Sequence, residues 1–192
     1  MASTDIRYAG RAFLYVLRLS GPEDILKVGI SQNPFMRWPA FHPRWFEAFD
    51  LEHSLLVETE TRSDAQCIET QMHRTLNSHR CPVPMTMRQQ AGGETEWYRG
   101  AYSAIRRIME ELTAQGYVVH NTATPWLAAV MREQQDTLVG LIHQAHSDAR
   151  AGWLTSMQRQ ALFDLLDAHR ALDPGVATAW PAELLADLGF RQ

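Results

Sequence analysis

Residues 12–31 read AFLYVLRLSGPEDILKVGIS, and this stretch predicts a β-hairpin. Its first eight residues are dense in strand-forming side chains, a Ser-Gly-Pro turn follows, and a second apolar run returns. A tyrosine, Tyr15, lies on the first strand, and a glycine, Gly29, lies near the end of the second. The hairpin is therefore expected to begin a small sheet that carries these two residues on neighbouring strands.

The segments after the hairpin predict further short strands and helices. A short helix is expected over residues 33–37, where an Asn-Pro pair supplies the N-cap and the first helical position. Strands are expected over residues 51–58 and 96–98, and an amphipathic helix over residues 102–116. Two prolines and a Gly-Gly pair in residues 80–95 predict a long mobile loop. This order favours an α/β (α+β) fold with a small mixed β-sheet flanked by helices.

A helix expected over residues 63–78 carries the most informative pattern, and Ser63 with Gln66 predicts its capping box. At about 100° per residue, Glu69 projects within the arc of the apolar stripe, and His73 lies at the flank of that arc. The stripe consists of Ala65, Ile68, Met72 and Leu76. An unpaired buried charge is costly, so this carboxylate needs a partner. The partner is either a structural ion pair or backbone amide, or a functional ligand.

The sequence changes character after residue 119, which predicts two domains, residues 1–119 and 120–192. In the second, helices are expected over residues 124–142 and 155–172, with a short final helix near the C-terminus. Their apolar stripes are too extensive to be covered within a lone hairpin. We therefore expect this helical extension to pack on the first domain or on a second copy of the chain, and we favour a homodimer through the C-terminal helices.

The composition excludes a protein whose whole surface is basic. With 18 basic and 22 acidic residues the formal charge is -4, so a nucleic acid would need a local patch or a metal-bridged phosphate. Lys27 is the only lysine. Cys67 and Cys81 lack metal-ligand spacing and form no disulfide framework, which favours a cytoplasmic location. Residues 1–11 lack the apolar segment of a secretory signal, and no apolar run is long enough to predict a membrane helix.

Several motifs follow one another in order along the chain: Leu14-Tyr15-Val16, Lys27-Val28-Gly29-Ile30-Ser31, Arg37, Glu69 with His73, and Glu96-Trp97-Tyr98. This series resembles the GIY-YIG nuclease superfamily, and in particular its branch with a Lys-Ile/Val-Gly second motif and a Glu-Trp-aromatic strand. The resemblance covers about the first 115 residues. It implies a GIY-YIG-like fold and a divalent-metal-dependent endonuclease that uses Mg²⁺ or Mn²⁺ to hydrolyse phosphodiester bonds of DNA.

The resemblance also implies roles for five residues. Glu69 is the expected metal ligand, and Mg²⁺ commonly takes only one or two protein carboxylates. Tyr15 is expected to activate or position the attacking water, and Lys27, in place of the tyrosine of the second motif, to lower the pKa of Tyr15 or contact phosphate. Arg37 is expected to stabilise the pentacovalent phosphorane, and His73 to align the phosphate or the water. Taken singly, each residue also has a structural explanation, such as a packed strand tyrosine or a surface arginine.

Tyr15, Lys27, Arg37, His73 and Glu69 are expected to meet at one solvent-open cleft. His42, Arg74 and Glu96 are expected to contact the substrate. Two other functions stay open. One is a non-catalytic nucleic-acid-binding module, which a salt bridge from Glu69 to Arg37 or Arg74 together with the absence of an accessible cleft would favour. The other is an interaction protein that acts through its C-terminal helices. The expected partner is DNA, and the sequence leaves open its strandedness and whether RNA is cut.

Overall fold

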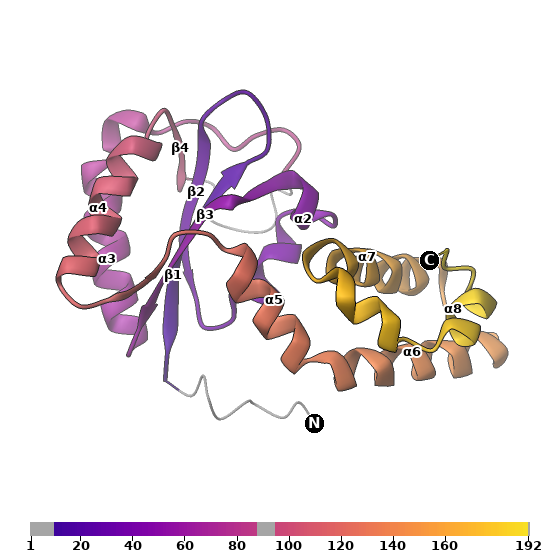
Figure 1. Ribbon diagram of the computed structural model, residues 1–192. Helices are drawn as coiled ribbons and strands as arrows, with labels where there is room; N and C mark the ends of the chain where they lie inside the picture. Colours follow the sequence, from indigo (N-terminus) through magenta and orange to yellow (C-terminus); the bar gives the residue numbers. More distant parts are fainter. Residues whose placement is uncertain (1–9, 88–94, 192) are drawn as a thin grey trace. The chain divides into compact units, whose positions relative to one another are not determined.

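The computed structural model of the protein describes residues 10–87 and 95–191 (Figure 1). The N-terminal segment before residue 10 and part of the loop predicted over residues 80–95 lie outside the described residues. Within the described ranges, none of the helices combines the length and the apolar character that a membrane span requires.

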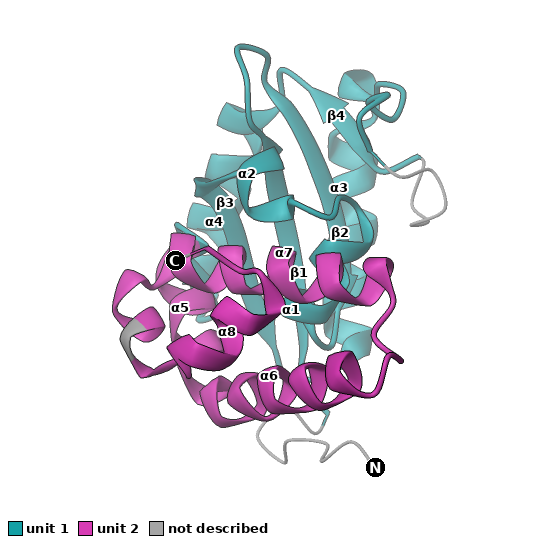
Figure 2. Cartoon of the chain, turned by 90° about the vertical axis from the view of Figure 1, so that its right-hand side faces the viewer, with its two compact units in different colours: residues 1–123 teal, residues 124–192 magenta. Residues whose placement is uncertain are grey.

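The chain divides into two compact units, residues 1–123 and residues 124–192 (Figure 2). The boundary expected at residue 119 falls within strand β5 (Val118–His120), which pairs with the third strand of the sheet. The first unit therefore includes this strand, and the second begins with helix α5 (Thr124–Glu133).

The first unit is built on a five-stranded sheet with the order β4-β2-β1-β3-β5. The other strands are β1 (Ala12–Leu19), β2 (Ile25–Ser31), β3 (Phe49–Thr59) and β4 (Trp97–Arg99). The predicted α/β class, a small sheet flanked by helices with a C-terminal helical extension, is confirmed. The sheet was predicted to mix parallel and antiparallel pairs, but each neighbouring pair of strands in it is antiparallel. The reason is that β2 and β3 both run against the central strand β1.

Two long helices, α3 (Arg62–Thr75) and α4 (Tyr102–Ala114), lie side by side on one face of this sheet (Figure 1). The core between the helices and the sheet includes Leu14, Val16, Leu26, Val28, Leu55, Val57, Ile68, Met72, Tyr98, Ile105 and Met109. Glu69 is only 6% exposed, as its position in the apolar arc of α3 predicted. Packing of α3 therefore fixes a carboxylate at the boundary of the core.

Helix α3 begins earlier than expected, and its cap differs from the predicted one. Thr61 is the N-cap, and its hydroxyl oxygen accepts from the Asp64 backbone N–H at 3.1 Å. The predicted capping box of Ser63 and Gln66 is therefore wrong, because both residues lie inside the helix. Gln66 does not cap the helix, and its amide donates to Glu69 Oε2 at 2.7 Å. The helix ends at Thr75, before the 3₁₀ turn η3 (Asn77–His79).

The opposite face of the sheet carries an aromatic cluster supplied by short helices. These are α1 (Pro34–Arg37), η2 (Trp38–Ala40) and α2 (Trp45–Ala48). The Asn33 side chain caps α1 by accepting from the Met36 N–H at 3.1 Å, as predicted. Trp38 packs edge-on against both Trp45 and Tyr15, with ring centroids 5.8 and 6.0 Å apart. Successive strand residues point to opposite faces, so Tyr15 lies on this aromatic side while Leu14 and Val16 face α3.

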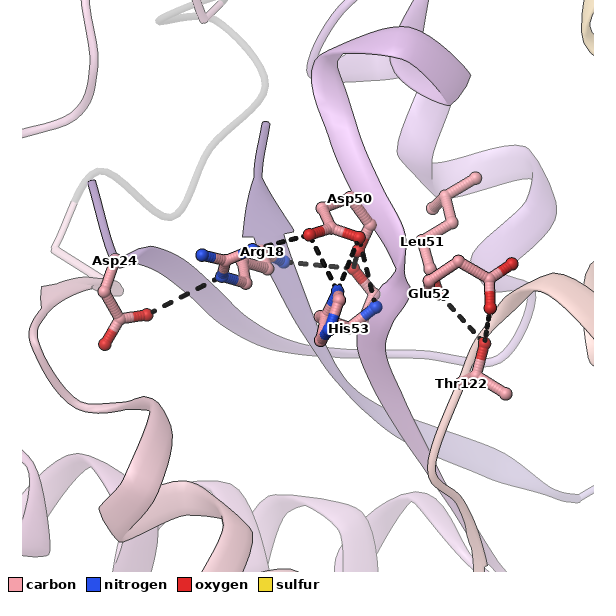
Figure 3. A network of polar contacts seen from close by, with 8 residues as sticks. Arg18, Asp24, Asp50, Leu51, Glu52, His53 and Thr122 are labelled. Atoms are coloured by element: carbon pink, nitrogen blue, oxygen red, sulfur yellow. Dashed lines mark hydrogen bonds and ion pairs between the residues drawn. The ribbon is translucent and has the colours of Figure 1, made fainter. Parts of the chain in front are cut away.

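A polar network joins β1 and β3 where their pairing shifts register, between Val16 and Arg18 (Figure 3). The Arg18 guanidinium donates to Asp50 Oδ2 at 2.5 Å, and the Arg18 N–H donates to Ser54 Oγ at 3.0 Å. His53 Nδ1 lies 2.9 Å from the same carboxylate oxygen of Asp50. At the register shift, side-chain hydrogen bonds replace backbone hydrogen bonds between β1 and β3, which keeps the two strands in contact.

The second unit contains α5 and three further helices, α6 (Gln135–Arg150), α7 (Ser156–Leu172) and α8 (Ala182–Leu188), with the 3₁₀ turn η5 (Pro174–Ala179). The single helix expected over residues 124–142 is two helices, because the chain leaves helical geometry at Gln134. Helix α7 is confirmed, and Thr155 with Gln158 forms its capping box.

The second unit has a hydrophobic core of its own. Helix α6 contributes Leu138 and Ile142, and α7 contributes Leu162 and Leu166. The segment after α7 adds Val176, Trp180, Leu185, Leu188 and Phe190 to the same core. The C-terminal segment thus covers much of the apolar surface that we expected to need another domain or a second copy. The homodimer through these helices stays a prediction.

One close contact in the hairpin fixes the register of β1 and β2. Tyr15 and Gly29 lie opposite each other, and the tyrosine ring crosses directly over the glycine. A Cβ atom at position 29 would lie 2.5 Å from the Tyr15 hydroxyl oxygen and 2.7 Å from Cζ of the same ring. Only glycine leaves room for this ring, because heavy atoms of a side chain cannot approach so closely without displacement.

We therefore expect Gly29→Ala to destabilise the first unit by about 1–3 kcal/mol, the usual cost of overpacking a well-packed site. Urea denaturation followed by tryptophan fluorescence measures this change. Gly140→Ala is the matched control, because nothing lies within 4 Å of a Cβ at that helical position. The control should leave the transition of the first unit unchanged, and an equal effect of both substitutions would contradict the proposed clash.

Candidate active site

Several of the residues predicted to carry function lie near strand β2, where its pairing with β4 ends. Strand β4 pairs with β2 from Ile25 to Lys27, and the Val28 N–H donates to the Glu96 carbonyl oxygen at 3.1 Å. Among the described residues, this pairing does not continue to Gly29. The Tyr15 ring crosses β2 at that point from one face of the sheet, and α3 packs on the other face. The sheet edge is thus where side chains from both faces can approach one another.

On the aromatic side, Tyr15 is paired with Arg37 at the end of α1. Burial raises the pKa of Tyr15 to about 12, against the opposing effect of the Arg37 guanidinium, which hydrogen-bonds to it. The negative charges of Glu96 and Glu69 raise this pKa further. Arg37 also lies over the Phe41 ring, 4.9 Å from its centroid, which holds the guanidinium plane in place. The Tyr15 phenol is therefore protonated at neutral pH.

Lys27 is completely buried and is paired with Glu96. Its ammonium group forms an ion pair with the Glu96 carboxylate and donates to the Val28 carbonyl oxygen at 3.2 Å. Burial lowers the pKa of Lys27, and the hydrogen bond and charge of Glu96 oppose that change. Arg37 is the cation that lowers the pKa of Tyr15, and the two roles expected for Lys27 stay predictions. Lys27 neutralises Glu96.

On the helical side, Glu69 is linked to His73 and Tyr98. Glu69 Oε1 lies 3.7 Å from His73 Nε2, and His73 Nδ1 lies 2.5 Å from the Tyr98 hydroxyl oxygen. The two rings also stack, with centroids 5.8 Å apart. His73 Nε2 is buried and has no hydrogen-bond partner, although it points towards the carboxylate. The described partners of Glu69 are Gln66 and His73.

Glu69, His73 and Glu96 form a group with the dimensions of a cation site. One ligand atom from each lies within 4.8 Å of the other two. Oxygen ligands bind Mg²⁺ at about 2.1 Å, so two ligands of one ion lie up to about 4.2 Å apart, and small side-chain rotations would bring any wider pair of this group into that range. The unpartnered nitrogen of His73 is directed into this group, and two carboxylates with an imidazole suit Mg²⁺ and Mn²⁺. These residues therefore fit a divalent cation.

Among the described residues, Glu69, His73 and Glu96 lie together, and the meeting of Tyr15, Lys27, Arg37, His73 and Glu69 at one solvent-open cleft stays a prediction. Glu69 and Glu96 both raise the pKa of Tyr15 and that of Tyr98, so their charges act on phenols from both faces of the sheet. Tyr15, Lys27 and Glu69 are buried, because aromatic packing and α3 cover them. A surface hollow formed by described residues reaches the group at His73, and its other lining residues are Thr70, Arg74, Asn77 and Arg80.

The three residues expected to contact substrate have different positions. Glu96 belongs to the central group through Lys27. Arg74 lies in the hollow beside His73 and is exposed. His42 Nδ1 accepts from the Arg44 N–H at 3.1 Å, so the described contact of His42 is within its own loop. Its place in the group is therefore not supported.

The sequence interpretation missed three residues that shape the group. Tyr98 was part of a strand motif, but its hydroxyl had no assigned partner before the structure placed it against His73. Gln66 had the spacing to reach Glu69 on one helix face, but the same spacing also predicted a cap. Arg80 hydrogen-bonds Tyr98 from beyond the end of α3, and no local sequence pattern indicated this contact.

Removing the Glu96 carboxylate should lower the stability of the first unit, because Lys27 is buried and would lose its counter-ion. We expect Glu96→Gln to lower the free energy of unfolding by about 3 kcal/mol at neutral pH, because it leaves a buried ammonium without its counter-ion. Glu23→Gln is the matched control, since Glu23 pairs with Arg99 at the surface, where an ion pair contributes about 1 kcal/mol or less. Urea denaturation of both variants measures the difference.

The pH dependence of that loss has a definite sign. Burial already holds the pKa of Lys27 below its ordinary value of 10.5, and loss of Glu96 lowers it further. Between the lowered pKa and 10.5 the unfolded chain binds more protons than the folded one, so stability rises with pH. The deficit of Glu96→Gln should therefore shrink as the pH approaches 10.5. A deficit that is small and independent of pH would show that Lys27 does not depend on Glu96.

Comparison with known proteins gives one match. The T5orf172 domain matches residues 12–113, which is more than half of the chain and includes every residue of the group at the sheet edge. No curated protein and no solved structure matches the sequence. The chain belongs to the T5orf172 domain family, a nuclease-like domain of the GIY-YIG-like type.

Proposed function

We propose that the first unit is a divalent-metal-dependent endonuclease that hydrolyses phosphodiester bonds of DNA. One observation carries the proposal: a tyrosine–arginine pair from one face of the sheet and a carboxylate–histidine pair from the other act on the same sheet edge. The family is nuclease-like, which supports the same class of reaction.

Glu69, His73 and Glu96 are the residues that would hold Mg²⁺ or Mn²⁺. When bound, such an ion polarises the phosphate and stabilises charge on the leaving oxygen. Glu69 is suited to this role because its two carboxylate oxygens have different neighbours. One accepts from Gln66, and the other faces His73 at the edge of the group. Gln66 therefore fixes the rotation of the carboxylate, as supporting residues of metal ligands do.

Arg37 and Tyr15 supply hydrogen-bond donors on the opposite side. The planar guanidinium of Arg37 can contact two phosphate oxygens at once and stabilise their increased charge during attack. Tyr15 is a neutral phenol at neutral pH, so it positions a water or phosphate oxygen by hydrogen bonding. The same burial that raises its pKa makes a phenolate base unfavourable without further positive charge.

His73 is oriented by Tyr98. The hydroxyl of Tyr98 is hydrogen-bonded to Nδ1 of the imidazole, so Nε2 faces the Glu69 carboxylate. Because the Tyr98 ring also stacks on the imidazole, both the position and the plane of His73 are fixed. This arrangement supports a role for Nε2 as a ligand or as a hydrogen-bond partner of the phosphate.

The two other functions have less support. A non-catalytic binding module was expected to tie Glu69 to Arg37 or Arg74, but its described partners are Gln66 and His73. For the interaction protein, the described residues of α6, α7 and α8 share an internal core, which accounts for much of the apolar surface on which that alternative rested. The nuclease function therefore accounts for the most observations.

Glu69→Gln should abolish cleavage while the fold is retained, because a glutamine is isosteric but is a poor ligand for Mg²⁺. Cleavage of plasmid and of single-stranded DNA is measured with Mg²⁺, with Mn²⁺ and with EDTA. Wild type should cut only with metal, and Glu69→Gln should lose at least about 10²-fold in rate, as for other removed charge-stabilising groups. The control is Glu110→Gln, which removes an exposed carboxylate on α4. Cleavage by wild type in EDTA, or by Glu69→Gln at the wild-type rate, would exclude the proposed mechanism.

Arg37→Lys tests whether a positive charge alone suffices at the phosphate. We expect a loss of at least about 10²-fold in cleavage rate, since a lysine ammonium cannot make the planar two-oxygen contact. Arg62→Lys on the exposed start of α3 is the control and should cleave normally. If Arg37→Lys cuts DNA as fast as wild type, Arg37 has no direct role in the reaction.

A further inference from the structure

The hollow beside His73 has the chemistry of an anion site. We propose that Arg74 and Arg80 bind a second phosphate of the substrate strand, next to the phosphate that is cleaved. This subsite rests on the proposed nuclease function, because its ligand is the nucleic acid that the central group would cut. It extends that function by assigning two arginines that hold the strand on the side away from Arg37.

The lining of the hollow consists of hydrogen-bond donors and contains no carboxylate. Thr70, His73, Arg74, Asn77 and Arg80 form it. Both arginines are exposed, and among the described residues neither is paired with an acidic side chain. A surface that holds two guanidinium groups and no carboxylate favours an anion, and guanidinium groups match the geometry of phosphate.

The helix places most of these donors in one row. Thr70, His73, Arg74 and Asn77 follow the i, i+3, i+4, i+7 spacing of one helix face along α3 and into the turn after it. Glu69 precedes this row by one residue, and His73 belongs both to the row and to the central group. A strand with one phosphate at the central group therefore continues along the row.

Arg80 connects the hollow to the central group of Glu69, His73 and Glu96 through Tyr98. It hydrogen-bonds the Tyr98 hydroxyl, which in turn contacts His73 Nδ1. A corresponding pair exists on the other face of the sheet, where Arg37 hydrogen-bonds Tyr15. The two carboxylates act electrostatically on both phenols. An arginine thus lies on each side of the acidic group, one for the reacting phosphate and one for its neighbour.

The net charge of the chain makes such local contacts necessary. At a formal charge of -4, the protein as a whole repels a polyanion, so binding depends on a few placed cations. A purely structural explanation also exists for Arg74, because cations near a helix C-terminus favour the helix dipole. The two explanations differ in their consequences, since only a phosphate contact changes the salt dependence of DNA binding.

Binding is measured by fluorescence anisotropy with a labelled single-stranded DNA and the full chain in EDTA, at several salt concentrations. We expect Arg74→Ala and Arg80→Ala each to weaken binding and to reduce the slope of log K against log salt by about 0.7 in magnitude. Arg74→Lys should restore the slope, because it keeps the charge. The matched control is Arg107→Ala, which removes an exposed arginine on α4 outside the hollow.

Arg74→Ala is the cleaner variant, because no described hydrogen bond of Arg74 supports His73, whereas Arg80 contacts Tyr98. Circular dichroism confirms that each variant is folded. If both arginine variants bind like Arg107→Ala, the subsite is excluded, while metal-dependent cleavage by wild type would still support the nuclease function. If the slopes fall as expected but no variant or wild type cuts DNA, the subsite stands as a nucleic-acid contact and the nuclease function does not.

Discussion

The passage of the Tyr15 ring over Gly29 is the contact on which the proposed site depends. It brings a hydroxyl from the aromatic face across β2 to the sheet edge, where α3 holds Glu69 from the other face. A side chain at position 29 would push this ring away and separate the two halves of the group. Gly29 is therefore needed because it has no side chain where the Tyr15 ring lies, and the hairpin register places it opposite the tyrosine.

Burial explains the electrostatics of the site. Lys27 and Glu69 are both buried, and such charges are tolerated only with partners. Glu96 neutralises Lys27, while Glu69 has a hydrogen bond from Gln66 and an imidazole at 3.7 Å. Glu69 is thus partly compensated within the chain, and a divalent cation between the acidic side chains would complete its compensation. The stability of the first unit and its proposed chemistry depend on the same charges.

Much of the fold follows from short-range patterns in the sequence. The hairpin, the Asn33 cap of α1 and the inward position of Glu69 on α3 were all predicted, because turn chemistry and helical periodicity are local. Strand direction and the start of α3 were not, since they depend on packing and on which of two possible caps is used. The break between α5 and α6 at Gln134 was not predicted, because no proline or glycine lies there.

The candidate site was predicted in part for the same reason. The order of Tyr15, Arg37 and Glu69 was visible as a resemblance, but contacts such as Tyr98 with His73 join residues far apart in the chain. Sequence spacing indicated neither the burial of Lys27 nor its pairing with Glu96. Long-range side-chain partners are set by tertiary packing, which a single sequence does not reveal.

The central claim is that Glu69, His73 and Glu96 together bind the divalent cation used for cleavage. A crystal grown with Mn²⁺, measured at a wavelength where manganese scatters anomalously, tests this most directly. The account predicts an anomalous peak between the two carboxylates, with His73 Nε2 among its ligands. A manganese ion bound elsewhere, with no peak at the sheet edge beside Gly29, would contradict it.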